Sequence, residues 1–284
     1  MKVRFWGVRG SFAMTGRDVL RYGGNTTSVE VQSDSGKRLL IDLGTGATEF
    51  AKQLMQQEFG KGQGELPILL SHTHLDHIQG LPFFTPFFVK GNRIRILGAN
   101  PVGSTLQATL QNQLSPHYSP LNGLENLAAG VSIDTFVPGA TLALDGFDVV
   151  TAAMPHGSMW TTAFRISAGG KTVVFLSDVE YPNPDKPLAS ALALAQGADL
   201  LIHDAMHADH DYAVRKGWGH SPARAGIAVA AQAGVRRLAL FHHSPDANDA
   251  MIDDAVRQAQ AQADSQTQRK IEIFAAAEGS YLTV

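Results

Sequence analysis

Three histidines and an aspartate fall within six positions of one short segment, Ser71–Gly80, which reads S-H-T-H-L-D-H-I-Q-G. In an extended chain, side chains two positions apart point the same way, so His72 and His74 can bind one ion as neutral imidazoles. Asp76 and His77 lie one step further on, where a turn into a helix would present them to a second ion. This spacing predicts a metal site rather than a packed core.

The residue types in this segment limit which metals it can bind. Imidazole and carboxylate groups without thiolate suit zinc best, and manganese or iron is also compatible. The chain contains no cysteine, so thiolate sites, disulfides and a cysteine nucleophile are excluded. The alternative interpretation is a histidine-rich surface turn that binds no metal. The position of the cluster directly after the apolar run 66–70 favours the metal site.

Three further polar residues follow apolar runs, at the strand ends where open sheets usually place their chemistry. His156, in M-P-H-G-S, comes in a predicted turn after a strand that we expect to end near Ala152. Asp178, in F-L-S-D-V-E, and His242, in L-A-L-F-H-H-S-P, each follow another apolar run. Each residue alone could cap a helix or be satisfied within a loop. Together with the histidine cluster, they predict that several strand ends supply one centre for two metal ions.

A histidine and an aspartate indicate proton transfer rather than metal binding. His220 lies in W-G-H-S at the start of a predicted helix, and Asp204 follows the predicted strand 199–203. A carboxylate that accepts a hydrogen bond from one ring nitrogen fixes the tautomer of a histidine, so the other nitrogen can donate a proton to a leaving group. The alternative is that His220 only forms part of the helix cap.

The other histidines receive no role in this chemistry. We expect structural or surface positions for His203, His207 and His210, in H-D-A-M-H-A-D-H. His243 directly follows a candidate ligand and should point elsewhere, either behind the site or toward solvent. His117 falls in the predicted loop 115–130 and should be exposed.

Composition places the 284-residue chain among ordinary globular proteins, with 44% hydrophobic and 17% charged residues. Its formal net charge of -3 argues against a broad basic footprint for nucleic acid, although a local site made cationic by metal ions would not show in that total. The first ten residues hold no continuous apolar stretch, and no later run approaches the roughly 20 apolar residues of a membrane span. We therefore expect a cytoplasmic protein that does not bind membranes.

Apolar runs and helical spacings predict the elements that must position these residues. Strands are expected at 3–6, 28–32, 38–42, 66–70, 93–97, 131–137, 141–144, 147–152, 162–167, 171–176, 199–203, 237–241, 271–274 and 281–284. Helices are expected at 48–59, 104–114, 187–196, 221–233 and 248–263. Ser221 is the expected N-cap of its helix and Gly234 its stop. No linker interrupts the chain, so we predict two mixed sheets packed face to face with helices outside, in one domain over residues 1–284.

The segment 81–88, L-P-F-F-T-P-F-F, holds four phenylalanines beside two prolines. It can be neither a regular helix nor a central strand. Two interpretations stay open. The rings either fill the core beneath the site, or they form a dimer surface or a hydrophobic rim over the substrate.

The order of these candidate ligands resembles that of the metallo-β-lactamase superfamily. H-T-H-L-D-H at 72–77 precedes His156, Asp178 and His242, and the likeness runs from G-V-R-G-S through L-I-D-L-G-T-G to W-G-H-S and L-F-H-H. Within the superfamily, the chain is similar to the branch of ribonuclease Z and the cyclic phosphodiesterases. The resemblance implies an α/β fold, a four-layer αββα sandwich with two metal ions at the edge between the sheets, and a homodimer.

The resemblance also implies roles for individual residues. The first zinc ion would be held by His72, His74 and His156. The second would be held by Asp76, His77 and His242, with Asp178 bridging both. The catalytic histidine and its acidic partner would be His220 and Asp204.

Two departures narrow the activity that the resemblance implies. Cysteine-containing β-lactamases are excluded, because the chain has no cysteine. Ribonuclease Z typically inserts a long substrate-binding arm between the third histidine and the bridging aspartate. Here only 22 positions separate His156 from Asp178, and a predicted hairpin occupies most of them, which argues against transfer-RNA processing.

We therefore expect a binuclear metal-dependent hydrolase that cleaves a small or cyclic phosphodiester of nucleotide or phosphoribosyl type. Two divalent ions, two aspartates and a bridging hydroxide leave the site with a net charge near +1, which complements the single negative charge of a phosphodiester. The bridging hydroxide would attack phosphorus, Asp76 would orient it, and His220 would protonate the departing oxygen. Three alternatives stay open: a ribonuclease without a transfer-RNA arm, a thioester or lactone hydrolase, and a non-enzymatic metal-dependent binding or sensor protein.

Overall fold

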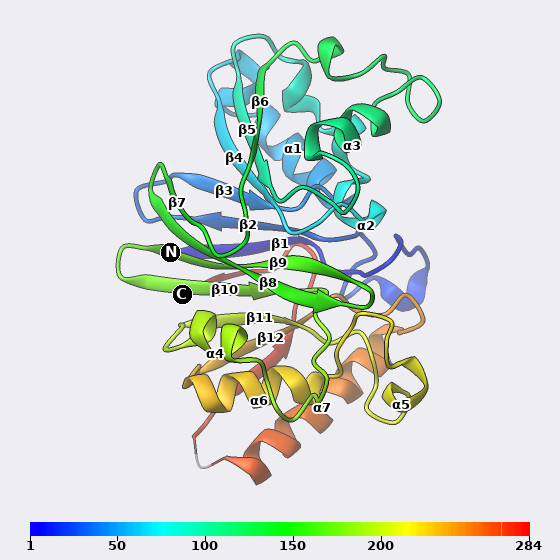
Figure 1. Ribbon diagram of the computed structural model, residues 1–284, viewed down its shortest axis with the longest axis vertical. Coiled ribbons are helices and arrows are strands. Elements are labelled where there is room, and N and C mark those ends of the chain that lie inside the picture. The colour runs from blue at the N-terminus through cyan, green and yellow to red at the C-terminus, as the bar shows by residue number, and fades with distance from the viewer. Residues whose placement is uncertain (268) are drawn as a thin grey trace.

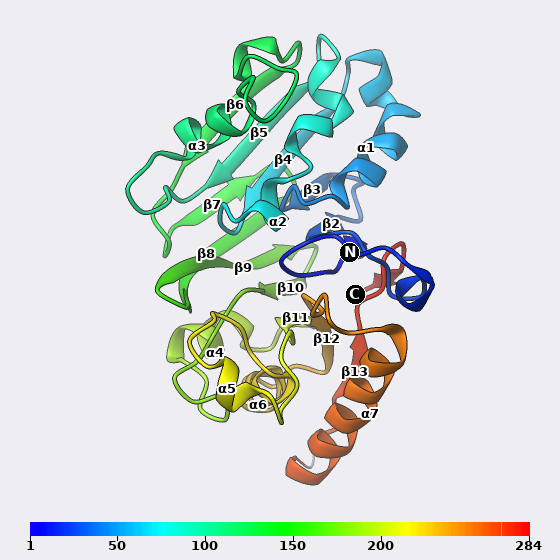
Figure 2. The ribbon, with the colours of Figure 1, turned by 90° about the vertical axis from the view of Figure 1, so that its right-hand side faces the viewer.

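Two seven-stranded mixed sheets stack face to face, and helices cover the outer face of each (Figures 1 and 2). A computed structural model describes residues 1–267 and 269–284. The helices outside the first sheet are α1 (Ala47–Met55) and α3 (Leu106–Gln113). Those outside the second sheet are α4 (Ala189–Ala195), α6 (Ala223–Ala233) and α7 (Asp249–Gln266). The arrangement confirms the predicted αββα sandwich.

Each sheet is antiparallel in one half and parallel in the other. The first sheet has the order β14-β1-β2-β3-β4-β5-β6 and is built from β1 (Lys2–Gly7), β2 (Ser28–Gln32), β3 (Arg38–Ile41), β4 (Glu65–Leu70), β5 (Arg93–Gly98), β6 (Gly130–Thr135) and β14 (Tyr281–Thr283). Strands β3 to β6 run parallel to one another. The carboxyl ends of β3 and β4 therefore meet at one edge of the sheet.

The second sheet repeats this pattern in the later part of the chain. Its order is β13-β12-β11-β10-β9-β8-β7, built from β7 (Thr141–Leu144), β8 (Phe147–His156), β9 (Met159–Ala168), β10 (Lys171–Leu176), β11 (Leu200–Asp204), β12 (Arg237–Phe241) and β13 (Glu272–Ala275). Strands β10 to β13 are parallel, so the carboxyl ends of β10, β11 and β12 also share one edge. The predicted strands are thus confirmed, with small shifts at their ends.

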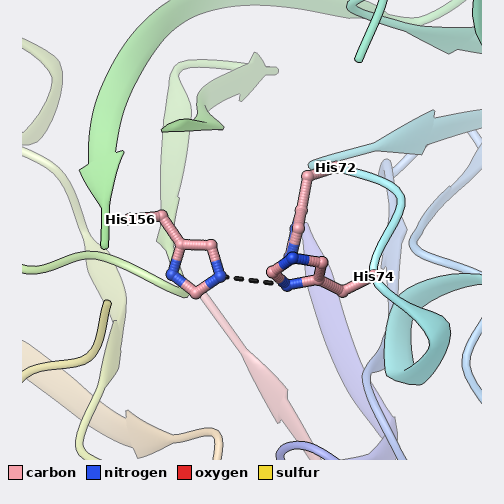
Figure 3. Close-up of side chains that lie close together, drawn as sticks. All are labelled: His72, His74 and His156. Atoms are coloured by element: carbon pink, nitrogen blue, oxygen red, sulfur yellow. Dashed lines mark hydrogen bonds between the residues drawn. The ribbon is translucent and has the colours of Figure 1, made fainter. Parts of the chain in front are cut away.

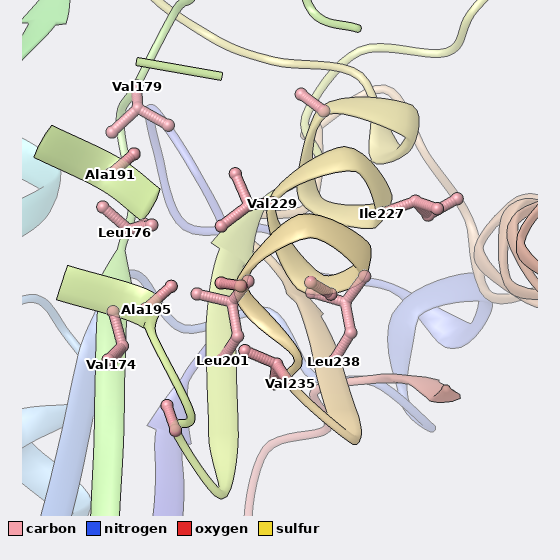
Figure 4. Close-up of a cluster of buried hydrophobic side chains, with 14 of the residues drawn as sticks. Val174, Leu176, Val179, Ala191, Ala195, Leu201, Ile227, Val229, Val235 and Leu238 are labelled. Carbon is pink, nitrogen blue, oxygen red and sulfur yellow. The ribbon is translucent and has the colours of Figure 1, made fainter. Parts of the chain in front are cut away.

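Three layers of apolar side chains hold the four structural layers together. Between the sheets lie aromatic rings from both, among them Phe5, Phe175 and Phe241. The outer face of the second sheet packs its aliphatic side chains from β10 to β12 against α4 and α6 (Figure 4). Alanines on these two helices allow close approach, and Gly234 ends α6 in a left-handed conformation, as predicted. The third layer lies between the first sheet and α1 and α3.

Short elements connect these layers. The one-turn helices are α2 (Leu75–Ile78) and α5 (Tyr212–Arg215). The 3-10 turns are η1 (Arg17–Val19), η2 (Glu58–Lys61), η3 (Leu81–Phe83), η4 (Thr85–Phe88) and η5 (Leu124–Asn126). The predicted helix 48–59 therefore divides into α1 and η2, and the predicted loop 115–130 contains η5.

Two local predictions were wrong. Strand β8 continues through His156, because Pro155 lies beyond residues 147–150 that pair with β7, and proline is tolerated where a strand has one neighbour. Ser221 does not cap α6, because Pro222 takes the N-cap position and the Ser221 hydroxyl instead donates a hydrogen bond of 2.6 Å to the Val179 carbonyl.

The segment 81–88 divides its phenylalanines between the core and the surface. It forms two consecutive 3-10 turns, which bury Phe84 and Phe87 completely against α1 and its neighbours. Phe83 and Phe88 are 61% and 38% exposed. Two of the rings therefore belong to the core, as the first interpretation has it, and for the two exposed rings the second interpretation stays a prediction.

None of the helices in the described parts of the chain is long and apolar enough to cross a membrane.

The two classes of phenylalanine in this segment make different predictions for stability. Replacing Phe87 by alanine should lower the free energy of unfolding by about 3–5 kcal/mol, because it removes a buried ring and leaves a cavity. Replacing the exposed Phe83 should change it by less than about 0.5 kcal/mol. Urea denaturation followed by circular dichroism measures both values. Similar losses in the two variants would contradict this division.

Candidate metal centre

The candidate ligands lie at the carboxyl ends of strands from both sheets. The segment that begins with His72 follows β4, and His156 ends β8. Asp178 and His242 follow β10 and β12, and both adopt the left-handed backbone conformation, with φ of 56° and 59°. This conformation turns the chain sharply at the two residues. Residues other than glycine adopt it only at a steric cost.

The first cluster is made of His72, His74 and His156, whose candidate ligand atoms lie within 4.8 Å of one another (Figure 3). Nε2 of His156 lies 3.1 Å from Nδ1 of His74. Burial lowers the pKa of all three imidazoles, and it lowers the pKa of His72 most strongly. Neutral imidazoles are the form that binds metal ions.

The second cluster is made of Asp76, His77, Asp178 and His242, again within 4.8 Å of one another. Asp178 stands at its centre, with carboxylate oxygens 3.3 Å from Nε2 of His77 and 3.2 Å from Nε2 of His242. The same carboxylate lies 3.9 Å from Nε2 of His72 and 4.0 Å from Nε2 of His156, which belong to the first cluster. Asp178 is therefore the residue that the two clusters share.

His220 and Asp204 form a third cluster with Asp178 and His242. Nδ1 of His220 donates a hydrogen bond of 2.8 Å to Asp204, which also accepts bonds from the backbone N–H groups of Ser221 and Met206. Burial alone would lower the pKa of His220, but the Asp204 carboxylate outweighs it and raises the pKa to about 9. The predicted pair is in contact, and its free Nε2 can carry a proton.

Buried negative charge dominates the electrostatics of the centre. The residues Asp42, Asp76, Asp178 and Asp204 are all at most 5% exposed. Within the described residues, every ion pair of these four carboxylates is with a histidine, and none is with lysine or arginine. Burying carboxylates without a cation is costly.

Histidine protons balance part of this charge. Burial would raise the pKa of Asp178, but His242 and His77 hold its pKa well below the usual range. Burial would lower the pKa of His77, but the surrounding aspartates raise that pKa well above 6.5. A raised pKa favours the protonated imidazole while no metal is bound, so metal binding at His77 would release a proton.

A backbone carbonyl orients the imidazole of His156, and a carboxylate orients that of His77. Nδ1 of His156 donates a hydrogen bond of 2.7 Å to the Gly219 carbonyl, so Nε2 faces the cluster. Nδ1 of His77 lies 2.7 Å from Asp42, which also accepts bonds from the backbone and the hydroxyl of Ser71. Such partners fix the tautomer of a metal-binding histidine.

Sequence reasoning missed Asp42. It follows the apolar strand β3 in L-I-D-L-G-T-G, which is the same signal that identified Asp178. The sequence offers no such signal for the backbone N–H of Ser11, which donates a hydrogen bond of 2.7 Å to Asp76 from the loop after β1.

The remaining histidines lie outside the clusters. His203 is buried and receives a hydrogen bond from the Tyr181 hydroxyl, 3.1 Å from its Nε2. His243 is buried behind the centre, and its Nε2 donates a hydrogen bond to the Ala276 carbonyl. His207 is buried beside His220, with 5.7 Å between ring centroids. His210 and His117 are exposed, the latter as expected.

The ligand types of the centre, and the buried ring nitrogens of two of its histidines, are suited to divalent metal ions. Imidazole and carboxylate donors without thiolate suit zinc, manganese or iron. Nε2 of His72 is buried and has no hydrogen-bond partner among the described residues. Nε2 of His77 is also buried and faces the carboxylates of Asp76 and Asp178, 3.4 and 3.3 Å away, where a shared metal ion could be held.

Comparison with known proteins assigns the family. Residues 37–243 match the family described as the β-lactamase superfamily domain, and the chain belongs to this family. It is 26% identical to ribonuclease Z of Haloarcula marismortui, over 90% of this chain and 91% of that relative. These likenesses confirm the predicted superfamily and its ribonuclease Z-like branch, and the chain is a metal-dependent hydrolase.

Two solved structures share the fold over the whole chain. The metallo-β-lactamase fold protein YhfI from Bacillus subtilis superposes with a TM-score of 0.71 at 22% identity, covering 99% of this chain and 98% of that one. A diphosphatase from the PhnP family superposes with a TM-score of 0.68 at 20% identity, covering 100% and 97%. The individual ligands stay predictions, which the geometry makes testable.

The Asp42–His77 contact predicts the effect of a substitution outside the ligand set. Asp42→Asn should lower the zinc affinity of one site by about 10–100-fold, because an amide no longer holds Nδ1 of His77 as a carboxylate does. Competition with a chromophoric chelator measures the affinity. Asp199→Asn is the matched control, since Asp199 bonds the Thr172 backbone at the opposite end of β10. Equal affinities in the Asp42 variant and the wild type would contradict the assignment.

Proposed function

We propose that the protein is a binuclear metal-dependent phosphodiesterase. The observation that carries the proposal is the position of Asp178, whose carboxylate lies within 4.0 Å of imidazoles from both clusters. One ion would be held by His72, His74 and His156, and the other by Asp76, His77 and His242. Asp178 would bridge them. Zinc is the favoured metal, with manganese or iron as alternatives.

A small or cyclic phosphodiester, of nucleotide or phosphoribosyl type, is the proposed substrate. When bound, two divalent ions supply a water of lowered pKa and positive charge that stabilises a phosphoryl group. The names of two similar proteins, ribonuclease Z and the PhnP-family diphosphatase, both describe phosphoryl chemistry and support this substrate class.

His220 is the proposed general acid, and Asp204 holds it in place. The hydrogen bond of 2.8 Å from Nδ1 to Asp204 leaves Nε2 to donate a proton to the departing oxygen. Asp76 would orient the attacking water in addition to binding metal. Its position is set by the Ser11 backbone and by His242, whose Nε2 lies 3.2 Å away.

A ribonuclease activity on short or unstructured RNA is the second candidate, because curated relatives carry the name ribonuclease Z. The interval between His156 and Asp178 is filled by β9, β10 and their turns, so no arm projects from it. We therefore favour a small substrate over transfer RNA. The cytoplasmic location, the homodimer and the single domain over residues 1–284 stay predictions, and Phe83 and Phe88 are the exposed rings available to a dimer contact.

A panel of substrates tests the proposed activity. Cyclic nucleotides, a phosphoribosyl cyclic phosphate, an acyl-thioester and a small RNA are incubated with protein loaded with zinc or with manganese. We expect turnover of at least one small phosphodiester and none of the acyl-thioester. Turnover of the thioester alone would identify an acyl hydrolase, and tight binding without product would identify a sensor. Either result would refute the phosphodiesterase.

The proposed acid predicts a dependence on the leaving group. His220→Ala should lower kcat by about 10²–10⁴-fold for a phosphodiester with an alkoxide leaving group, which needs a proton. With bis(p-nitrophenyl) phosphate the loss should be much smaller, because p-nitrophenolate departs without one. His210→Ala, in the exposed part of the same segment, is the control. Equal losses on both substrates would show that His220 does not act as the acid.

A further inference from the structure

Glu180, two residues after Asp178, is a buried carboxylate for which the proposed chemistry has no use. It is 8% exposed and lies in the segment that follows β10. Its two oxygens accept hydrogen bonds of 2.6 Å from the Gly217 N–H and 2.7 Å from the Gly219 N–H. The Tyr212 hydroxyl lies 3.3 Å from one of the same oxygens. All three donors belong to the segment that ends at His220.

The partners of Glu180 are dipoles only. Its hydrogen-bond donors are two backbone N–H groups and a tyrosine hydroxyl, all of which are neutral. A buried carboxylate without a cation is costly, so its hydrogen bonds must compensate for the lost hydration. These hydrogen bonds order the loop. Gly217 and Gly219 have positive φ, 93° and 94°, and without the bonds these glycines would sample many other conformations.

The loop that Glu180 binds contacts His156 of the first cluster and leads directly into His220. The Gly219 carbonyl accepts the 2.7 Å hydrogen bond from Nδ1 of His156, and His220 is the next residue. The fit at this point is tight, since a Cβ atom built on Gly219 would lie 2.4 Å from Nδ1 of His156. The backbone N–H of Glu180 also donates to the Pro155 carbonyl at 2.9 Å, next to His156. Displacement of the loop would therefore release the imidazole.

We propose that Glu180 is a positioning residue, which fixes the tautomer of His156 and the place of His220 through the backbone of residues 217–219. The inference rests on the proposed function, because it assigns His156 to a metal ion. The positioning role requires a side chain with two acceptor oxygens. Glutamine offers only one, since its amide nitrogen cannot accept the second N–H. Aspartate has two, but it is one methylene shorter and does not reach the loop.

Nuclear magnetic resonance of the metal-free protein tests the proposal without any activity. Long-range proton–nitrogen spectra report which ring nitrogen of each histidine carries the proton, and a His156→Gln variant assigns the His156 signals. The wild type should show His156 protonated at Nδ1. Glu180→Gln should populate both tautomers, and it should lower the zinc affinity of one of the two sites by about 10–100-fold while the other site keeps its affinity.

Two variants serve as controls. Tyr212→Phe removes one contact but leaves both backbone bonds, so His156 should keep its tautomer. Glu30→Gln alters another buried carboxylate, which accepts a bond from Trp6 Nε1 in the first sheet, and it should leave zinc binding unchanged. If Glu180→Gln fails to fold by circular dichroism, Glu180→Asp carries the same test with the charge retained.

The outcomes separate this inference from the proposed function. A Glu180 variant that folds and keeps both the wild-type tautomer and both zinc affinities overturns the positioning role. A shift in the tautomer together with a weakened site supports it. Wild-type protein that binds two zinc ions and cleaves no phosphodiester refutes the proposed function but leaves the role of Glu180 intact.

Discussion

The constraint on which this structure depends is buried negative charge. Four carboxylates, those of Asp42, Asp76, Asp178 and Asp204, lie at one edge of the sandwich, and histidines are their ion-pair partners. Water cannot stabilise them there, and a protonated His77 compensates only part of their charge. A divalent cation bound among them would offset this charge. Metal binding at this site would therefore stabilise the native state.

The two sheets provide the geometry that makes such a gathering possible. The parallel strands of each sheet aim their carboxyl ends at a common edge, and β8 points the same way because the antiparallel β9 lies between it and β10. Strand β4 of the first sheet and β8, β10, β11 and β12 of the second therefore deliver groups to one place. The first two clusters each need both sheets: His156 joins His72 and His74 across the interface, and His242 and Asp178 join Asp76 and His77. The aromatic core between the sheets, including Phe5 and Phe241, therefore determines distances in the centre as well as stability.

Much of this arrangement could be predicted from the sequence, because it follows from local patterns. Apolar runs that end in a histidine or an aspartate identified Asp178 and His242, and the same pattern at Asp42 would have identified the partner of His77. Partners formed by the backbone escaped prediction. The Gly219 carbonyl and the Ser11 N–H have no side-chain signature, and their positions depend on contacts between segments far apart in the chain. Pro155 suggested that the strand ends before it. Strand β8 nevertheless continues, because at Pro155 it pairs only with β9 and its other edge is open.

The left-handed backbone at Asp42, Asp178 and His242 has a consequence for how this protein can be improved. Glycine adopts that conformation without the steric cost that a side chain pays, roughly 1–2 kcal/mol per residue. Relief of backbone strain alone would therefore favour glycine at these candidate positions of the centre. Glycine would at the same time remove the side chains on which the proposed chemistry depends. At these three turns, stability and activity impose opposite demands on a single residue, and the retained side chains record which demand prevailed.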